Sequence, residues 1–188
     1  MLPQTFEFKP APVRRAVRVE VGETEAALRG HDGTEVSRLV FSSARSARFA
    51  DIAARGMKSR WFDVHGEGGR FRLQCNSSWG DDPKKDGDLA QYHGAVRAVL
   101  AGLEAHAPHV GIDIGPGRGT RVAMFSIGLL ALAVAVVVAT STVDTSDVAT
   151  PRLLAAVLGL AGVMLVARFR PWGPRETMSA AELRAKLD

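Results

Sequence analysis

The side chains best suited to chemistry are concentrated in one short segment, CNSSWGDDPKKDGDLAQYHG, at positions 75–94. It contains Cys75, the one cysteine of the chain, together with His93 and aspartates on either side of two lysines. A single cysteine cannot form an internal disulfide, and a free thiol is typical of a reducing compartment. The segment could bind a metal ion, or it could be the polar start of an ordinary structural element.

Calcium is the first metal to consider, because the segment partly matches the spacing of an EF-hand loop. Asp82, Asp86 and Gly87 stand where such a loop has its first, fifth and sixth residues. However, Lys84 occupies the third position, and His93 stands at the twelfth, where a bidentate glutamate is required. A solvated loop that leads into a helix is the better interpretation.

Zinc would need several soft ligands at short spacing. We expect Cys75 on the inward side of a strand. The histidines His93, His106 and His109 lie around one expected helix without a Cys-x-x-Cys or His-Glu-x-x-His motif. The run GPGRGT at 115–120 lacks the Lys-Ser/Thr end of a phosphate-binding P-loop. We therefore predict no metal and no cofactor and, without a Gly-x-Ser-x-Gly motif, no enzyme.

The elements that would position this segment are mainly short strands. The run 17–21 alternates apolar and polar residues, and the run 36–41 is rich in β-branched and aromatic residues. The clearest hairpin is RWFDVHGEGGRFRLQC at 60–75, in which two apolar alternations meet at a glycine-rich turn from Gly66 to Gly69. One apolar and one polar face per strand is typical of an antiparallel sheet.

A helix is expected directly after the strands. Apolar residues recur at three- and four-residue spacing from Leu89 onward, which predicts a helix over about 89–106. Asp88 is the expected N-cap, with Gln91 completing a variant capping box, and Pro108 ends the helix. The segment with Cys75 is thus expected to connect the last strand to this helix.

The strongest pattern comes late in the chain. VAMFSIGLLALAVAVVVA, at 122–139, is 18 residues without a charge, and as a helix it spans about 27 Å, close to the thickness of a bilayer core. A second apolar run, 153–167, follows a polar spacer. Gly159 and Gly162 offer a small-residue surface for close helix packing and for homo-oligomerisation. These features predict a two-helix transmembrane hairpin.

Arginines precede the first apolar run and follow the second, whereas the spacer between them carries mainly aspartates. By the positive-inside rule, both termini are then cytoplasmic, and the protein crosses the inner (cell) membrane twice. Neither run contains an ionisable residue, which argues against an ion pathway.

Several strands capped by one amphipathic helix are the outline of a pleckstrin-homology-like (PH-like) barrel. The order RLVF … SRWFDVHGEGGRFRLQCNSSW … AQYHGAVRAVLAGLEAH, followed by two apolar runs and a polar tail, resembles small bacterial membrane proteins with a PH-like cytoplasmic domain. The resemblance begins near position 14 and implies binding of lipid headgroups or peptides, with no catalytic residue. The predicted fold is α+β: a PH-like antiparallel β-barrel closed by one C-terminal helix, followed by a two-helix transmembrane hairpin.

The tail carries its own helix pattern. Ser179 and Glu182 have the spacing of a capping box, which predicts a short helix over 180–187. The expected divisions of the whole chain are a cytoplasmic domain (1–110), a glycine-rich linker (111–121), a first span (122–139), an external loop (140–152), a second span with its interface (153–172) and a cytoplasmic tail (173–188).

Charge suggests one binding surface. A net charge of +4 is too moderate for a polybasic nucleic-acid binder, so no nucleic acid is expected as a partner. The segment 38–60 is nevertheless strongly basic, with Asp51 as its single acid. Anionic lipid attracts each cation near its surface by about 1 kcal/mol, and a solvated sheet face is the alternative. The candidate residues for anionic lipid or a partner are Arg45, Arg48, Arg55, Lys58 and Arg60.

These patterns predict a non-enzymatic, membrane-anchored binding or scaffolding module. Its PH-like domain would recognise a protein partner or the anionic membrane surface. The alternative is an accessory subunit of a larger membrane protein complex.

Overall fold

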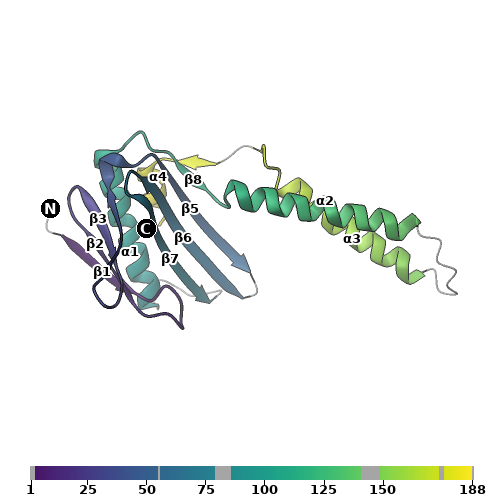
Figure 1. Cartoon of the computed structure of the whole chain (residues 1–188), viewed down its shortest axis with the longest axis horizontal. Coiled ribbons are helices and arrows are strands. Elements are labelled where there is room, and N and C mark those ends of the chain that lie inside the picture. Colours follow the sequence, from purple (N-terminus) through teal and green to yellow (C-terminus); the bar gives the residue numbers. More distant parts are fainter. Residues whose placement is uncertain (1–2, 55, 79–85, 141–148, 174–175, 188) are drawn as a thin grey trace. The chain divides into compact units, whose positions relative to one another are not determined.

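The computed structural model describes residues 3–54, 56–78, 86–140, 149–173 and 176–187. It has two compact units, one formed by 1–115 together with 175–188 and the other by 116–174. The elements (Figure 1) are β1 Gln4–Phe8, β2 Val17–Val21, β3 Glu25–Arg29, β4 Glu35–Val40, the 3-10 helix η1 Phe41–Ser43, β5 Ser46–Ala54, β6 Met57–Gly66, β7 Gly69–Ser78, α1 Gly87–His106, β8 Ile112–Ile114, α2 Arg118–Thr140, α3 Ala149–Arg168, β9 Thr177–Met178 and α4 Ala180–Lys186.

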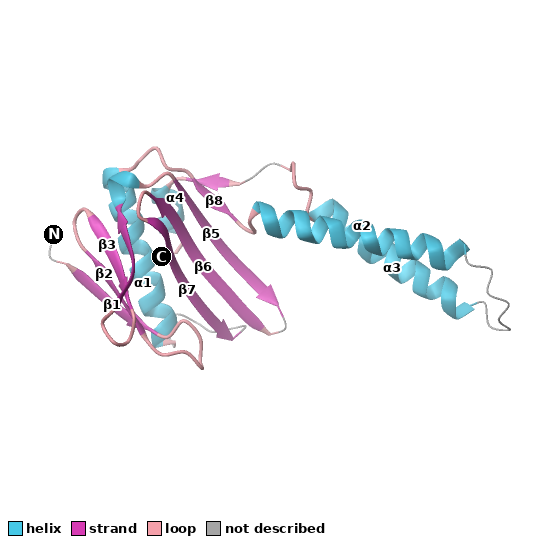
Figure 2. Cartoon of the chain, in the orientation of Figure 1, coloured by secondary structure: helices cyan, strands magenta, loops and turns pink. Residues whose placement is uncertain are grey.

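The first unit contains two sheets and a long helix. One sheet has the strand order β1-β2-β3-β4, and the other has the order β7-β6-β5-β8-β9. Figure 2 shows α1 running alongside both, and it packs against β1 and β2 of the first sheet and β7 of the second. The common core includes Phe41, Phe62 and Tyr92. The α+β class is confirmed.

The prediction of a closed PH-like barrel is wrong. In the described chain, no strand of the first sheet pairs with a strand of the second. The physical reason lies at η1, where the chain leaves β4 and turns into the second sheet. There β5 pairs with β6 and β8 instead of β4. The result is two sheets that share a core with α1.

β6 and β7 form the hairpin that the sequence predicted, with longer arms. Their register pairs Phe62 with Leu73 and Val64 with Phe71, and each of these four side chains is at most 1% exposed. Gly69 begins β7 with a φ of 100°, a backbone conformation that strains any residue with a Cβ. The tight turn therefore depends on glycine at this position.

α1 confirms the helix predicted from apolar spacing, but its N-cap is Asp86. The Asp86 Oδ1 accepts the backbone N–H groups of Asp88 at 3.0 Å and Leu89 at 3.3 Å. Asp88, the predicted cap, instead accepts the N–H of Lys9 at 3.0 Å. Both aspartates precede the apolar stripe. The backbone of Lys9, directly after β1, engages Asp88, and Asp86 caps the helix.

The first unit is discontinuous in sequence. β8 lies in the expected glycine-rich linker and pairs in parallel with β5, while β9 pairs antiparallel with β8. α4 packs on α1, where Leu183 is 1% exposed and Arg184 pairs with Glu104 at 3.1 Å. The segments that lead into and out of the second unit are thus neighbouring strands of one sheet.

The tail helix predicted from Ser179 and Glu182 is confirmed. The hydroxyl of Ser179 accepts the N–H of Glu182 at 3.2 Å, and the Glu182 carboxylate accepts the N–H of Ser179 at 2.7 Å. This bond from the Ser179 backbone lowers the pKa of Glu182. Seven residues are marginal as an isolated helix, so the burial of Leu183 accounts for its formation.

The second unit consists of α2 and α3, which pack against each other. α2 has 23 residues, and its most apolar stretch has a mean hydropathy of 2.7. Among the described residues, it is the one helix that could cross a membrane by length and composition. The prediction of a two-helix transmembrane hairpin is therefore wrong, as is the location that rested on it, with two spans in the inner membrane and both termini in the cytoplasm.

The reason lies in the short uncharged part of α3. Its uncharged part, 153–167, has 15 residues between Arg152 and Arg168, which span about 22 Å as a helix, well short of a hydrocarbon core of roughly 30 Å. The predicted second span with its interface extends as far as Trp172, but the helix ends at Arg168. Trp172 instead lies edge-on to the ring of Phe125, with 5.3 Å between ring centroids.

Candidate functional site

The basic segment proposed to bind anionic lipid contains cations that already have acidic partners. Arg45 pairs with Glu67 at 3.2 Å, and Arg48 lies 3.8 Å from Asp113. Arg55 falls outside the described residues. Both acids lie beyond the segment itself, so sequence proximity alone did not reveal these pairs.

Strand alternation also divides the cations between two faces. Paired residues share a face of a sheet, so Arg48 lies with Asp63, whereas Arg60 lies with Asp51 on the opposite face. Arg60 points to the core side and is 6% exposed, and Lys58, two residues earlier on β6, shares that side. The described candidates therefore do not form a single lipid-facing surface.

Arg60 belongs to a polar cluster at the core side of β5, β6 and β7. Its guanidinium donates to the Ser77 Oγ at 2.7 Å and lies 3.4 Å from the Asp51 carboxylate. Ser77 is buried, whereas the Asp51 side chain is 41% exposed. Cys75 lies opposite Arg60 on β7 and is buried. The cluster thus extends from the core toward the surface.

α1 contributes two side chains to this region whose polar atoms lack partners. The hydroxyl of Tyr92 and the Nε2 of His93 are buried, and neither forms a hydrogen bond with any described residue. Their ring centroids are 5.8 Å apart. Buried polar atoms without a partner are rare, because each costs free energy unless a water, ion or ligand satisfies it.

Burial and nearby charge fix the protonation of both rings. Burial raises the pKa of Tyr92 well above its ordinary value, with Arg60 opposing the shift. Burial also lowers the pKa of His93, and the positive charges of Arg60 and Arg97 lower it further. Since the ordinary values are about 10 and 6.5, both side chains are neutral near pH 7. Each can then donate one hydrogen bond.

This arrangement favours ligand binding by hydrogen bonds over metal coordination. No group of three or more His, Cys, Asp or Glu side chains that could hold a metal occurs within the described residues. Asp86 of the calcium spacing caps α1, and Asp82 and Lys84 fall outside the described residues. What the cluster supplies is a buried cation and two neutral donors.

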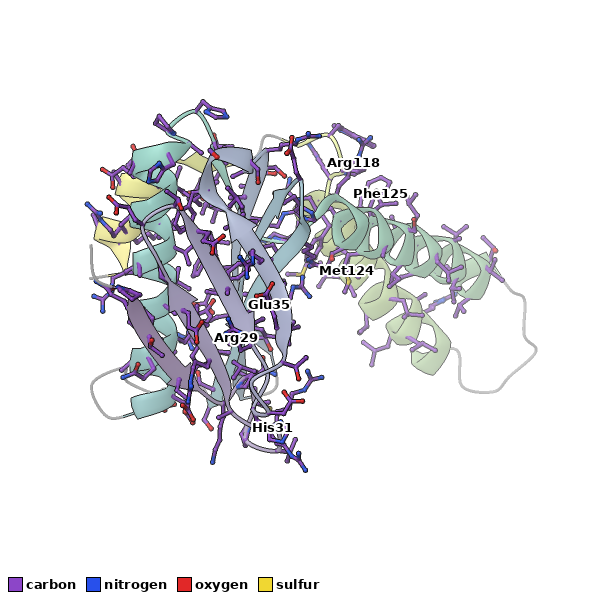
Figure 3. The ribbon with its side chains drawn as sticks, turned by 60° about the vertical axis from the view of Figure 1, so that its left-hand side comes forward. Arg29, His31, Glu35, Arg118, Met124 and Phe125 are labelled. Atoms are coloured by element: carbon purple, nitrogen blue, oxygen red, sulfur yellow. The ribbon has the colours of Figure 1, made fainter. Side chains whose placement is uncertain are left out.

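A second charged region covers the outer face of the first sheet. Arg29 pairs with Glu20 at 2.8 Å and lies 4.0 Å from Glu35, and Figure 3 shows Arg29 and Glu35 next to each other. Arg38 continues the series to Glu35 and Glu25 at 2.7 and 3.1 Å, and its hydrogen bond lowers the pKa of Glu35. Alternating, exposed pairs of this kind are typical of a solvated surface.

A groove of about 560 Å³ opens between α1 and the ends of β1 and β2. Glycines allow α1 to approach β1 and η1 closely. A Cβ on Gly94 would lie 2.8 Å from the ring of Phe6, and one on Gly102 would lie 2.3 Å from the ring of Phe41. The same small residues that permit close packing leave the groove open.

Small residues also bring α2 and α3 into contact. A Cβ on Gly128 would lie 2.9 Å from the Leu165 Cβ and 3.0 Å from the backbone oxygen of Gly162. Gly159 is different, because a Cβ there would meet Ala135 at 3.8 Å, an ordinary contact distance. Of the two glycines named from the sequence for helix packing, Gly162 makes the close contact.

Sequence patterns did not reveal the polar cluster as a site. Tyr92 lies three residues after Leu89, within the predicted apolar stripe, and this position is the signal that would have indicated a buried hydroxyl. The basic segment presents Arg60 as a lipid-facing cation, and no pattern singles out Ser77. Strand register, which brings Arg60 beside both Ser77 and Asp51, was the missing information.

The molecule is therefore an α+β protein with a discontinuous two-sheet unit and a helical unit, and within the described part of the chain α2 is the one helix that could span a membrane. No family model and no curated protein matches the chain. The resemblance to bacterial membrane proteins with a PH-like domain rests on the sequence pattern alone.

Proposed function

We propose that this chain is a membrane-attached binding module and not an enzyme, in which α2 provides the attachment and the two-sheet unit provides the binding. The observation that carries the proposal is α2, whose most apolar stretch is only 11% buried. Ile127, Leu130 and Val137 are 51, 65 and 62% exposed. A contiguous apolar surface of this kind is unfavourable in water and favours a membrane or partner.

The polar cluster supports a binding role for the two-sheet unit. Arg60 is a buried cation whose described partners are Ser77 and Asp51, and Tyr92 and His93 present buried polar atoms without described partners. The outer face of the first sheet supports it less, because its charges pair with one another.

A second candidate function is that of an accessory subunit in a larger membrane complex. It is favoured by the exposure of α3, where Leu153, Leu160 and Met164 are 68, 65 and 64% exposed. The uncharged part of α3 is shorter than a bilayer core, so apolar helices of a partner protein could cover its exposed side chains. Stoichiometric co-purification of another membrane protein in mild detergent would favour this alternative.

The experiment that tests attachment uses the neighbouring strands β8 and β9. The N–H of Ile114 donates to the oxygen of Glu176 at 2.8 Å, so a short Gly-Ser linker can replace 116–174 while both strands are kept. We expect the full chain to remain in the membrane pellet after salt and alkaline washes and to dissolve in detergent. The linker variant should be found in the supernatant and unfold cooperatively. Release of the full chain by salt alone would contradict attachment through α2.

A further inference from the structure

We propose that Lys58, Arg60, Tyr92 and His93 form a binding site for a small oxyanion, either a carboxylate or a phosphate group. The inference deepens the proposed function by naming a class of ligand, and its physiological role rests on that function. Lys58 and Arg60 lie on the core side of β6, and Tyr92 and His93 lie near the start of α1, which packs against the neighbouring strand β7.

The donors at this site exceed the acceptors. A guanidinium has five N–H groups, and the described partners of Arg60 are Ser77 and Asp51. The hydroxyl of Tyr92 and the Nε2 of His93 add two buried groups without a described acceptor. An oxyanion presents several acceptor oxygens at once, so a single group of this kind could satisfy donors from both β6 and α1.

The balance of charge also favours an anion. Lys58 shares a sheet face with Arg60, and its side chain forms no ion pair or hydrogen bond with any described residue. Asp51 is the acid beside Arg60 on that face. On the opposite face, Asp63 is occupied by Arg70 and Arg72. Among the described residues on this face of the sheet, Lys58 and Arg60 with the one carboxylate of Asp51 leave a net positive charge.

The site is deep at one end and open at the other. Arg60 and Tyr92 are 6% and 0% exposed, whereas Asp51 is 41% exposed and His93 is half-buried. A ligand could therefore place one oxyanion among buried donors, where electrostatic attraction is stronger than in water, while the remainder of the molecule stays outside.

The single tyrosine of the chain permits a direct test on the full chain in detergent micelles. Tyrosine labelled with ¹³C at Cζ gives one NMR resonance, from Tyr92. We expect inorganic phosphate, but not chloride at the same ionic strength, to shift this resonance saturably. Lys58→Gln and His93→Gln should each raise the half-saturation concentration by about ten-fold. Arg45→Gln, which removes an exposed cation outside the cluster, is the matched control and should leave it unchanged.

Micelles doped with phosphatidic acid form a second arm without free phosphate. A shift with inorganic phosphate identifies a free oxyanion as a ligand, and a shift with phosphatidic acid alone identifies a lipid headgroup. The inference is overturned if neither probe shifts the resonance, or if Lys58→Gln and His93→Gln both leave the response unchanged. Membrane sedimentation is measured separately, so a chain that binds phosphate but does not sediment would reject attachment and retain the site.

Discussion

The two units differ in the burial of their large apolar side chains. In the two-sheet unit, Phe41, Phe62 and Leu183 are at most 1% exposed, whereas Leu130 and Leu160 in the helical unit are each 65% exposed. α1 interrupts its apolar residues with polar ones and so packs along one side. α2 is apolar on all sides and needs apolar surroundings. The two units therefore differ in what they require. The two-sheet unit buries its apolar side chains in its own core, whereas the helical unit needs an apolar environment outside itself.

The sharpest test of this comparison substitutes one leucine in each unit. Leu183→Ala should lower the free energy of unfolding by about 3 kcal/mol, since it leaves a cavity beneath α4. Leu130→Ala, at an exposed position of α2, should change it by less than about 0.5 kcal/mol. Denaturant unfolding of the full chain in one detergent measures both. Equal losses would mean that the outward side of α2 is covered within the protein.

A second test concerns the contact between α2 and α3. Gly128→Leu should destabilise their packing by about 1–3 kcal/mol, because the new side chain meets Leu165 and the backbone of Gly162. Gly159→Ala is the matched control, since its Cβ has ordinary space next to Ala135. Limited proteolysis in detergent follows separation of the helices. If both variants resist the protease like the unchanged chain, the close contact at Gly128 is not what holds the helices together.

Local patterns in the sequence predicted the local elements. Alternation gave the β6–β7 hairpin, apolar spacing gave α1, and Ser179 with Glu182 gave α4, because the forces that form these elements act between near neighbours. β8 and β9 have three and two residues, too few to carry a pattern. They are strands because a partner is present, which also explains why the discontinuous unit could not be predicted.

The polar cluster was hidden for a related reason. Arg45, Arg48 and Arg60 are close in sequence, yet they lie before a strand, on its outer face and on the core side of the next strand. A count of cations cannot separate these environments. The tyrosine in the apolar stripe was the available clue, and the place of Arg60 beside Ser77 and Asp51 became visible only through the register of β6 with β5 and β7.

A smaller effect should appear in the pH dependence of the two-sheet unit. Burial, Arg60 and Arg97 lower the pKa of His93 in the folded chain, whereas the unfolded value is about 6.5. The unfolded state therefore binds more protons below that pH, so stability should fall as the pH decreases from 7.5 to 5.5. His93→Gln should remove part of this loss, and His109→Gln, at an exposed position, should not. A loss of the same size in all three chains would place its origin outside the cluster.

The smallest effect is expected from the exposed arginines, and it tests whether the two-sheet unit shares in membrane attachment. Arg45 and Glu67 are each more than 70% exposed, so their ion pair contributes little, and Arg48 faces the opposite side of the sheet from Arg60. Replacing Arg45 and Arg48 together by glutamate should therefore leave sedimentation with membranes unchanged at low and high salt. Flotation with vesicles of phosphatidylcholine, with and without phosphatidylserine, measures the same point for the linker variant that lacks 116–174. The contrary outcome is strong binding to the anionic vesicles alone that weakens with salt and is lost when both arginines are replaced. It would show that the basic segment contacts the lipid. The division of tasks between the two units would then no longer hold.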